Sequence, residues 1–235
     1  MYYFACITVG IAVVQFLLLP IYIRLKNSKK FTILKITIKV CMTVIAADFC
    51  AFGIFTLSAR NGGIQNLVTP KGYTTNLFVL YGLIICAVAD ALLVIKFAVG
   101  MLFFFLGHIC YIIYFLKIAP FNPVSIIVFV ITAGILAIYF NKYRENMGKL
   151  KIAYFIYGVT INVTFALGIM LPFSIGSYGV VPAIAATLLV ISDVMLALNN
   201  MHKRKVLSDL MYLGYYFMGQ FCMALSVFIP IMLDL

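Results

Sequence analysis

The chain has few acidic residues and few charges of either sign. Of its 235 residues, 6 are Asp or Glu and 10% are charged, whereas 66% are hydrophobic. This is too little polar surface to coat a soluble globule, so the composition indicates an integral membrane protein. The longest polar stretches, 59–74 and 141–151, are too short to form a soluble domain. We therefore expect one transmembrane helical domain over residues 1–235.

Histidine and paired cysteine motifs are also scarce. The chain has 2 His, and its 6 Cys show no CxxC spacing. A metal-dependent, ceramidase-like hydrolase would need about three histidines for its zinc, which is a typical number of catalytic ligands, and the chain has too few. A membrane serine protease would need a Gly-x-Ser-x-Gly setting, which the sequence lacks. The cysteines all fall in apolar runs and are expected to be reduced packing residues. We expect no metal centre and no cofactor.

Long apolar runs occupy most of the chain. Runs of about 20 residues match the roughly 30 Å hydrocarbon thickness of a bilayer. They predict an all-α, polytopic membrane protein with about eight transmembrane helices, at 2–23, 32–58, 75–95, 97–117, 121–140, 151–171, 178–199 and 208–232. The first run lacks the charged start and cleavage site of a signal peptide, so it is expected to remain as the first helix.

Basic residues gather in alternate loops. The odd-numbered loops hold most of the 17 Lys and Arg: Arg24, Lys26, Lys29, Lys30, Lys96, Lys142, Arg144, Lys149, Lys151, Lys203, Arg204 and Lys205. The even-numbered loops hold Arg60, Lys71 and Lys117. The positive-inside rule places the odd loops in the cytoplasm and both termini outside. We expect the membrane to be a bacterial-type cell membrane. The net charge of +11 then faces anionic headgroups and requires no nucleic acid; the partner is the bilayer.

Two aspartates lie inside apolar runs, where a carboxylate is costly and marks a candidate functional site. Asp90 lies five residues, and Asp193 six, before the cytoplasmic ends of their helices, so both should lie about 7–9 Å deep. Asp48 should lie nearer the middle of the bilayer or in its outer half, away from the other two. Structural pairing explains its presence at least as well as a role in chemistry does. Other polar side chains predicted to line the same cavity are Lys39, His108, Asn162, Tyr215, Tyr216 and Gln220.

Each of these residues also has a structural explanation. Lys39 could snorkel to the membrane surface together with Lys35, one turn earlier, instead of contacting a phosphate. His108 could be an interior hydrogen-bonding histidine instead of a base. Asn162 and Gln220 are by default interhelical hydrogen-bonding residues. Function is favoured by the two aspartates at one depth more than by any one residue.

A weak internal similarity relates the two aspartate helices. The sequence ADALL at 89–93 is similar to SDVML at 192–196, and the helices that follow carry GHIC at 107–110 and GQFC at 219–222. Both pairs are four helices apart and run in the same direction. This spacing is consistent with a parallel repeat of four plus four helices, although a few matched residues in apolar sequence also arise by chance.

Two half-buried carboxyl groups can divide the work of acid–base catalysis. Burial disfavours the charged form of a carboxyl group, and a second carboxylate nearby disfavours it further. One acid can then be protonated at neutral pH while the other stays ionised. This division suits cleavage through an oxocarbenium-like species, in which one group donates a proton and the other stabilises the cation or activates water.

The motifs around these residues resemble those of the YhhN-like lysoplasmalogenase family. The likeness runs from Gly82-Leu83 and Asp90 through GMLFF at 100–104 and GHICY at 107–111 to Ser192-Asp193 and Tyr215-Tyr216 with Gln220. Ala89 stands where the family commonly has Gly, and the proline expected beside Lys39 is missing.

The resemblance implies a membrane hydrolase that cleaves the vinyl-ether bond of lysoplasmalogens to a fatty aldehyde and a glycerophospho-base. It implies that Asp90 and Asp193 share the acid and base roles. It also implies that the lysophospholipid substrate is bound by Lys39, His108, Tyr111, Asn162, Tyr215, Tyr216 and Gln220. Headgroup preference and oligomeric state are left open.

Two other classes also use intramembrane aspartates. An aspartyl protease has Gly-x-Gly-Asp, which is replaced here by Val88-Ala89-Asp90. A small transporter or lipid-translocating protein could use Asp48, Asp90 and Asp193 as proton or cation sites, and a repeat would suit it. The prolines lie near the predicted helix ends, so the sequence gives no evident helix break for transport. The hydrolase is the favoured interpretation and the transporter the alternative.

Overall fold

The computed structural model describes residues 2–26, 31–60, 73–201 and 209–229, and every regular element in these ranges is a helix. This confirms the all-α prediction, and each of the eight predicted ranges overlaps one long helix. These are α1 (Tyr2–Lys26), α2 (Thr32–Arg60), α3 (Tyr73–Ile95), α4 (Phe97–Ile118), α5 (Val124–Tyr143), α6 (Lys151–Ile169), α8 (Val180–Met201) and α9 (Asp209–Ser226). Shorter connections are η2 (Gly148–Leu150), α7 (Leu171–Ile175) and η3 (Gly176–Gly179).

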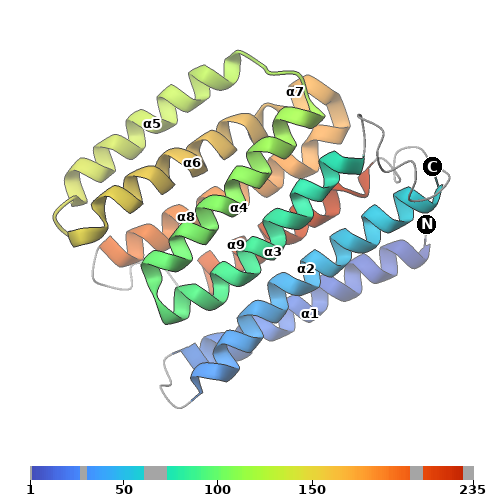
Figure 1. Ribbon diagram of the computed structural model, residues 1–235, viewed down its shortest axis with the longest axis horizontal. Coiled ribbons are helices and arrows are strands. Elements are labelled where there is room, and N and C mark those ends of the chain that lie inside the picture. The colour runs from blue at the N-terminus through green and yellow to red at the C-terminus, as the bar shows by residue number, and fades with distance from the viewer. Residues whose placement is uncertain (1, 27–30, 61–72, 202–208, 230–235) are drawn as a thin grey trace.

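The long helices lie side by side in one bundle (Figure 1). Among the described residues, five segments are long and apolar enough to cross a membrane: Thr32–Leu57, Thr75–Ile95, Phe97–Ile118, Val124–Tyr143 and Gly148–Asn200, the last of which contains both α6 and α8. Large apolar side chains are exposed on the outside, among them Ile33 and Ile138. The chain is an integral membrane protein, whereas the count of eight spans and the internal repeat stay predictions.

The helix ends differ from the predicted ones where local hydrogen bonds decide them. The fifth helix begins at Val124, not at residue 121, because the Asn122 side chain accepts a hydrogen bond from the Val124 N–H at 3.0 Å. The last helix ends at Ser226, where Val227 N–H bonds to the Ala224 carbonyl and a turn begins. Pro20, expected near a helix end, lies inside α1.

The hairpin of α3 and α4 positions Asp90 and His108. Lys96 adopts an extended conformation (φ −147°, ψ 100°) that separates the two helices, as the predicted boundaries required. A Cβ at Gly100 would lie 2.6 Å from the Leu93 Cα, and one at Gly82 would enter the Tyr111 ring. Because both positions are glycine, the two helices can approach closely along their length.

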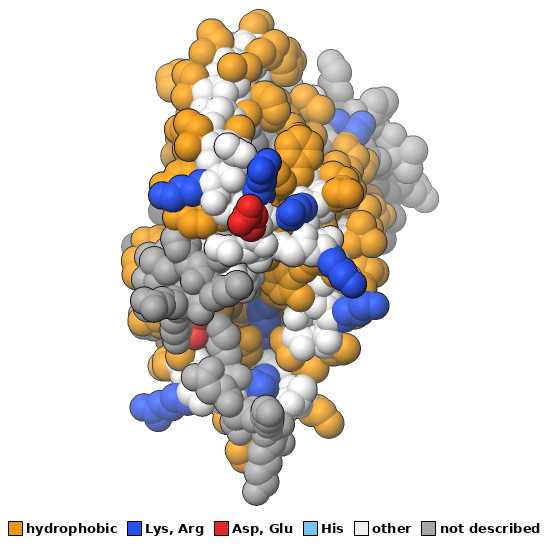
Figure 2. Space-filling view, turned by 90° about the vertical axis from the view of Figure 1, so that its left-hand side faces the viewer, with side chains coloured by type: hydrophobic (Ala, Val, Ile, Leu, Met, Phe, Trp, Pro, Cys, Tyr) orange, Lys and Arg blue, Asp and Glu red, His pale blue; other side chains and the backbone are white. Residues whose placement is uncertain are grey.

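The helix ends beside the predicted cytoplasmic loops gather at one end of the bundle. The end of α1, the start of α2, the α3–α4 and α5–α6 connections and the end of α8 lie at the left of Figure 1, opposite the start of α1. Figure 2 shows Lys and Arg side chains across this face. Exposed basic residues in or next to the α3–α4 and α5–α6 connections are Lys96, Lys142, Arg144, Lys149 and Lys151. We call this face the basic end. Lys29, Lys30, Lys71, Lys203, Arg204 and Lys205 lie outside the described residues.

Candidate active site

Asp90 on α3 is fully buried and has three partners from two other helices. The Lys39 Nζ lies 2.9 Å from Oδ1 and forms an ion pair with it. The angles at this contact are not those of a hydrogen bond. The hydroxyl groups of Thr43 and Tyr216 donate to Oδ2 at 2.5 and 2.9 Å. Lys39 and Thr43 are four residues apart on α2, so one face of that helix presents both. The charge of Asp90 is thus compensated inside the protein.

The Lys39 side chain points inward. It is 4% exposed and its ammonium group pairs with Asp90, so it does not snorkel to the membrane surface with Lys35. A buried charge without a partner is costly in a low-dielectric interior, and this pair removes that cost for both groups. Contact between Lys39 and a substrate phosphate stays a prediction.

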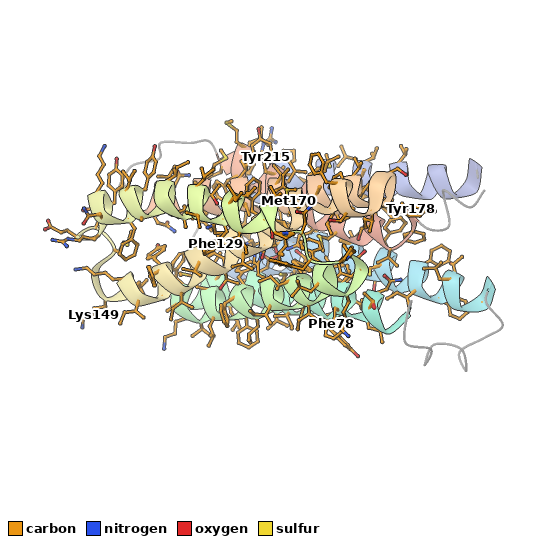
Figure 3. The ribbon with its side chains drawn as sticks, turned by 90° about the horizontal axis from the view of Figure 1, so that it is seen from above. Phe78, Phe129, Lys149, Met170, Tyr178 and Tyr215 are labelled. Atoms are coloured by element: carbon orange, nitrogen blue, oxygen red, sulfur yellow. The ribbon has the colours of Figure 1, made fainter. Side chains whose placement is uncertain are left out.

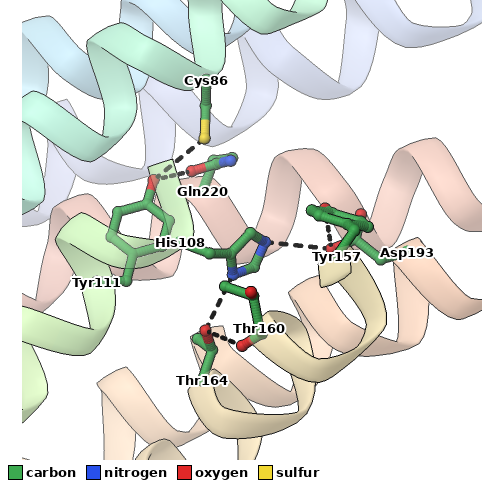
Figure 4. Close-up of polar contacts among 8 residues, drawn as sticks. All are labelled: Cys86, His108, Tyr111, Tyr157, Thr160, Thr164, Asp193 and Gln220. Carbon is green, nitrogen blue, oxygen red and sulfur yellow. Dashed lines mark hydrogen bonds and ion pairs between the residues drawn. The ribbon is translucent and has the colours of Figure 1, made fainter. Parts of the chain in front are cut away.

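Asp193 on α8 contacts a different set of residues (Figure 4). The Tyr157 hydroxyl of α6 donates to its Oδ2 at 2.8 Å, and the His108 Nε2 of α4 lies 3.2 Å from the same oxygen. Asp193 retains 9% exposure, whereas Asp90 has none. The two carboxylates therefore have separate partners.

A second polar chain continues from the other side of the His108 ring. Its Nδ1 lies 3.2 Å from the Thr164 Oγ1, and the Thr164 hydroxyl donates to the Thr160 carbonyl at 3.0 Å (Figure 4). The Tyr111 and His108 rings pack edge to face, with 5.9 Å between the ring centroids. The imidazole is therefore fixed by α6, α8 and its own helix.

Two further predicted residues form one buried pair. The Tyr111 hydroxyl donates to Oε1 of Gln220 at 2.5 Å and lies 3.9 Å from the Cys86 Sγ (Figure 4). This links α3, α4 and α9 beside the His108 ring. Tyr215 is only partly buried and packs against the core edge, where Figure 3 labels it. The predicted substrate contacts of these three residues stay predictions.

Asn162 joins α6 to α5. It accepts a short hydrogen bond from the Thr132 hydroxyl and donates to the Phe129 carbonyl at 3.1 Å. This is the interhelical role that its residue type favours by default. Asp48, by contrast, is exposed on α2, and its pairing and role stay predictions.

A groove of about 680 Å³ lies between α5, α6 and α8 and reaches α4. Its walls are mainly apolar, and Asp193 is the one carboxylate that lines it among the described residues; neither Asp90 nor His108 does. Phe129, labelled in Figure 3, lies near the start of α5, and Phe165 lies near the end of α6, so both are far from the basic end along their helices. Asn200, near the end of α8, and Met147, in the α5–α6 connection, lie toward the basic end. The volume is within the range of about 300–1,000 Å³ that is usual for small-molecule sites.

The sequence did not single out Thr43, Tyr157 or Thr164. A threonine or tyrosine on an apolar helix is unexceptional, and only its neighbours in space reveal its role. A weak signal was available, because Tyr157 and Thr164 are seven residues apart and so share one face of α6. Of the polar residues of α6, Tyr157 and Asn162 line the groove, whereas Thr164 does not.

Fold and site together define an α-helical integral membrane protein in which Asp90 and Asp193 are buried between helices and Asp193 lines an apolar groove. The model of the YhhN family matches residues 31–227, most of the chain. The chain belongs to the YhhN family, as the resemblance of its motifs implied. Searches of curated proteins and of solved structures found no match.

Proposed function

We propose that the protein is a membrane hydrolase that cleaves the vinyl-ether bond of lysoplasmalogens. The observation that carries this proposal is the position of Asp193 on the wall of an apolar groove, hydrogen-bonded to Tyr157 and beside the His108 ring. Membership of the YhhN family supports it, because this family is associated with lysoplasmalogenase.

The groove suits a lipid with one hydrocarbon chain. The apolar walls would hold the alkenyl chain, and the phosphate headgroup would face the basic end. Asp193 and Asn200 are seven residues apart on α8, which is about 10 Å along the helix axis. A headgroup near Asn200 would therefore place the glycerol and its ether oxygen near the Asp193 carboxyl group.

The reaction needs an acid, a base and water. A proton bonds to the alkene carbon distal to the ether oxygen, which uses the π electrons and leaves an oxocarbenium ion. Water adds to the carbon that carries the oxygen and returns a proton to the base. The hemiacetal then breaks its bond to the glycerol oxygen, which takes a proton, and the fatty aldehyde is released. A positioned acid and base of this kind contribute roughly 10²–10⁴-fold each.

The two aspartates have unequal parts in this proposal. Asp193 lines the groove and would exchange protons with the substrate and water. Asp90 is paired with Lys39 behind the site and would hold Tyr216 and the surrounding helices in place. This division replaces the equal sharing of acid and base roles that the family resemblance implied.

The test is aldehyde release by the purified protein in lipid nanodiscs. We expect fatty aldehyde from a lysoplasmalogen, and no fatty acid from a one-chain lysophospholipid that carries an ester in place of the vinyl ether. Release of aldehyde from the first lipid and of fatty acid from the second would contradict the assigned bond. Proton or cation flux in liposomes without any aldehyde would favour the transporter.

A further inference from the structure

The hydrogen bonds around His108 determine where its proton lies. Thr164 donates its single hydroxyl hydrogen to the Thr160 carbonyl one turn earlier, a common bond for a helical threonine. Its Oγ1 can then only accept a hydrogen bond from the His108 Nδ1 at 3.2 Å. Nδ1 must therefore carry a hydrogen.

This assignment has a consequence for the opposite side of the ring. A neutral imidazole with its hydrogen on Nδ1 has a bare Nε2, and that atom lies 3.2 Å from the Asp193 Oδ2. The same oxygen already accepts the Tyr157 hydroxyl hydrogen. Two bare acceptors repel each other at this distance, so one additional proton must lie between Nε2 and Oδ2.

We propose that the His108–Asp193 pair stores the proton that is delivered to the substrate, and that Thr164 is the positioning residue that keeps it there. The inference rests on the proposed function and deepens it. The stored proton forms the new C–H bond at the distal alkene carbon, and the π pair of the alkene is consumed. The attacking water then returns one proton to the pair, so the pair is unchanged after one turnover.

Asp193 is suited to pass this proton on because it belongs to both the pair and the groove. Among the described residues, both polar contacts of Asp193 use Oδ2, and the carboxyl group retains 9% exposure. His108 does not line the groove. The imidazole thus stores and orients the proton, and the carboxyl group is the part that meets the substrate.

The chain offers a direct test because it contains only 2 histidines, His108 and His202. Histidine-selective ¹⁵N labelling of the His202→Gln protein in nanodiscs leaves the signals of one ring. We expect a proton-bearing Nδ1 and an Nε2 that shares a proton. In Thr164→Val, Nδ1 loses its acceptor, and we expect its ¹⁵N signal to shift and kcat to fall about 10²-fold with KM little changed.

Two further variants separate positioning from simple damage. Thr164→Ser keeps the hydroxyl group and should restore both the ¹⁵N signals and kcat. Thr187→Val removes a matched hydroxyl that bonds only to its own helix, at the Ala183 carbonyl, and should change neither.

The outcomes for the two proposals are distinct. A bare Nδ1 in the protein with native Thr164 would overturn the proton assignment even if aldehyde is released. The expected ¹⁵N signals without aldehyde release would overturn the proposed function and leave the stored proton in place.

Discussion

Asp90 and Asp193 are the same residue type and are predicted to lie at similar depth, yet their surroundings give them different capacities. Asp90 is fully buried and is compensated by Lys39, Thr43 and Tyr216. Asp193 contacts a ring nitrogen and one hydroxyl and lines the groove. A costly buried carboxylate can be structural or reactive, and its partners and its access to a cavity are the grounds on which we propose the reactive role for Asp193 and the structural role for Asp90.

The two sites nevertheless share a pattern. Asp90 on α3 has partners on α2 and on α9, which is the helix that follows Asp193. Asp193 on α8 has partners on α6 and on α4, which is the helix that follows Asp90. Such an exchange is what a repeat of four plus four helices would produce around a two-fold axis along the membrane normal. It agrees with the predicted repeat, which stays a prediction.

The largest expected effect is on turnover in Asp193→Asn. Asn can still accept the Tyr157 hydrogen bond but cannot exchange a proton, so kcat should fall roughly 10²–10⁴-fold. The unfolding free energy should change by no more than about 1–3 kcal/mol. Aldehyde release and thermal unfolding measure the two effects. Asp48→Asn, an exposed carboxylate on α2, is the matched control and should keep full turnover.

The next effect is on stability in Lys39→Met. Removing the ammonium leaves the Asp90 carboxylate buried without its counter-charge, which should cost about 3–5 kcal/mol of unfolding free energy. Lys39→Met combined with Asp90→Leu should recover most of that loss, because no unpaired charge is left. Denaturant unfolding in micelles measures both, with the exposed Lys151→Met as control. Equal losses in the single and double variants would argue against a compensating pair.

The sequence predicted several residues of this site, but not how they are divided between its two aspartates. Lys39, Asp90 and Tyr216 are among the residues predicted to line one cavity, and both Lys39 and Tyr216 contact Asp90. His108 contacts Asp193. Counting residues from helix ends predicts depth, but not which helices are neighbours. It therefore could not separate the surroundings of the two aspartates, nor assign Asn162 to the contact with α5.

A smaller effect should follow from filling the groove. Gly158 lines it, and a Cβ there would meet no atom within 4 Å, so Gly158→Phe should enter the groove without a clash. We expect KM to rise about tenfold, equivalent to about 1.4 kcal/mol of lost binding. Gly134→Phe is the matched control, because Gly134 is equally open but does not line the groove. Identical kinetics of the two variants would place the lipid chain elsewhere.

The smallest effect is expected for Thr132→Val, which removes the hydroxyl that bonds Asn162 across α5 and α6. Interhelical hydrogen bonds in membrane proteins contribute about 0.6 kcal/mol on average. Thermal unfolding of Thr132→Val should show a loss of unfolding free energy of this size. Thr187→Val should show a smaller loss. A loss of several kcal/mol would mean that Asn162 supports more than the contact of these two helices.

The division between the two aspartates is tested most directly by single-turnover aldehyde release from folded protein. Asp193→Asn should be compared with Asp90→Asn/Lys39→Met, which removes the charges of the buried pair together. If Asp193 is the group that meets the substrate, its variant should be slower than the double variant by at least about tenfold, or roughly 1.4 kcal/mol. Equal rates, or a slower double variant, would contradict this division.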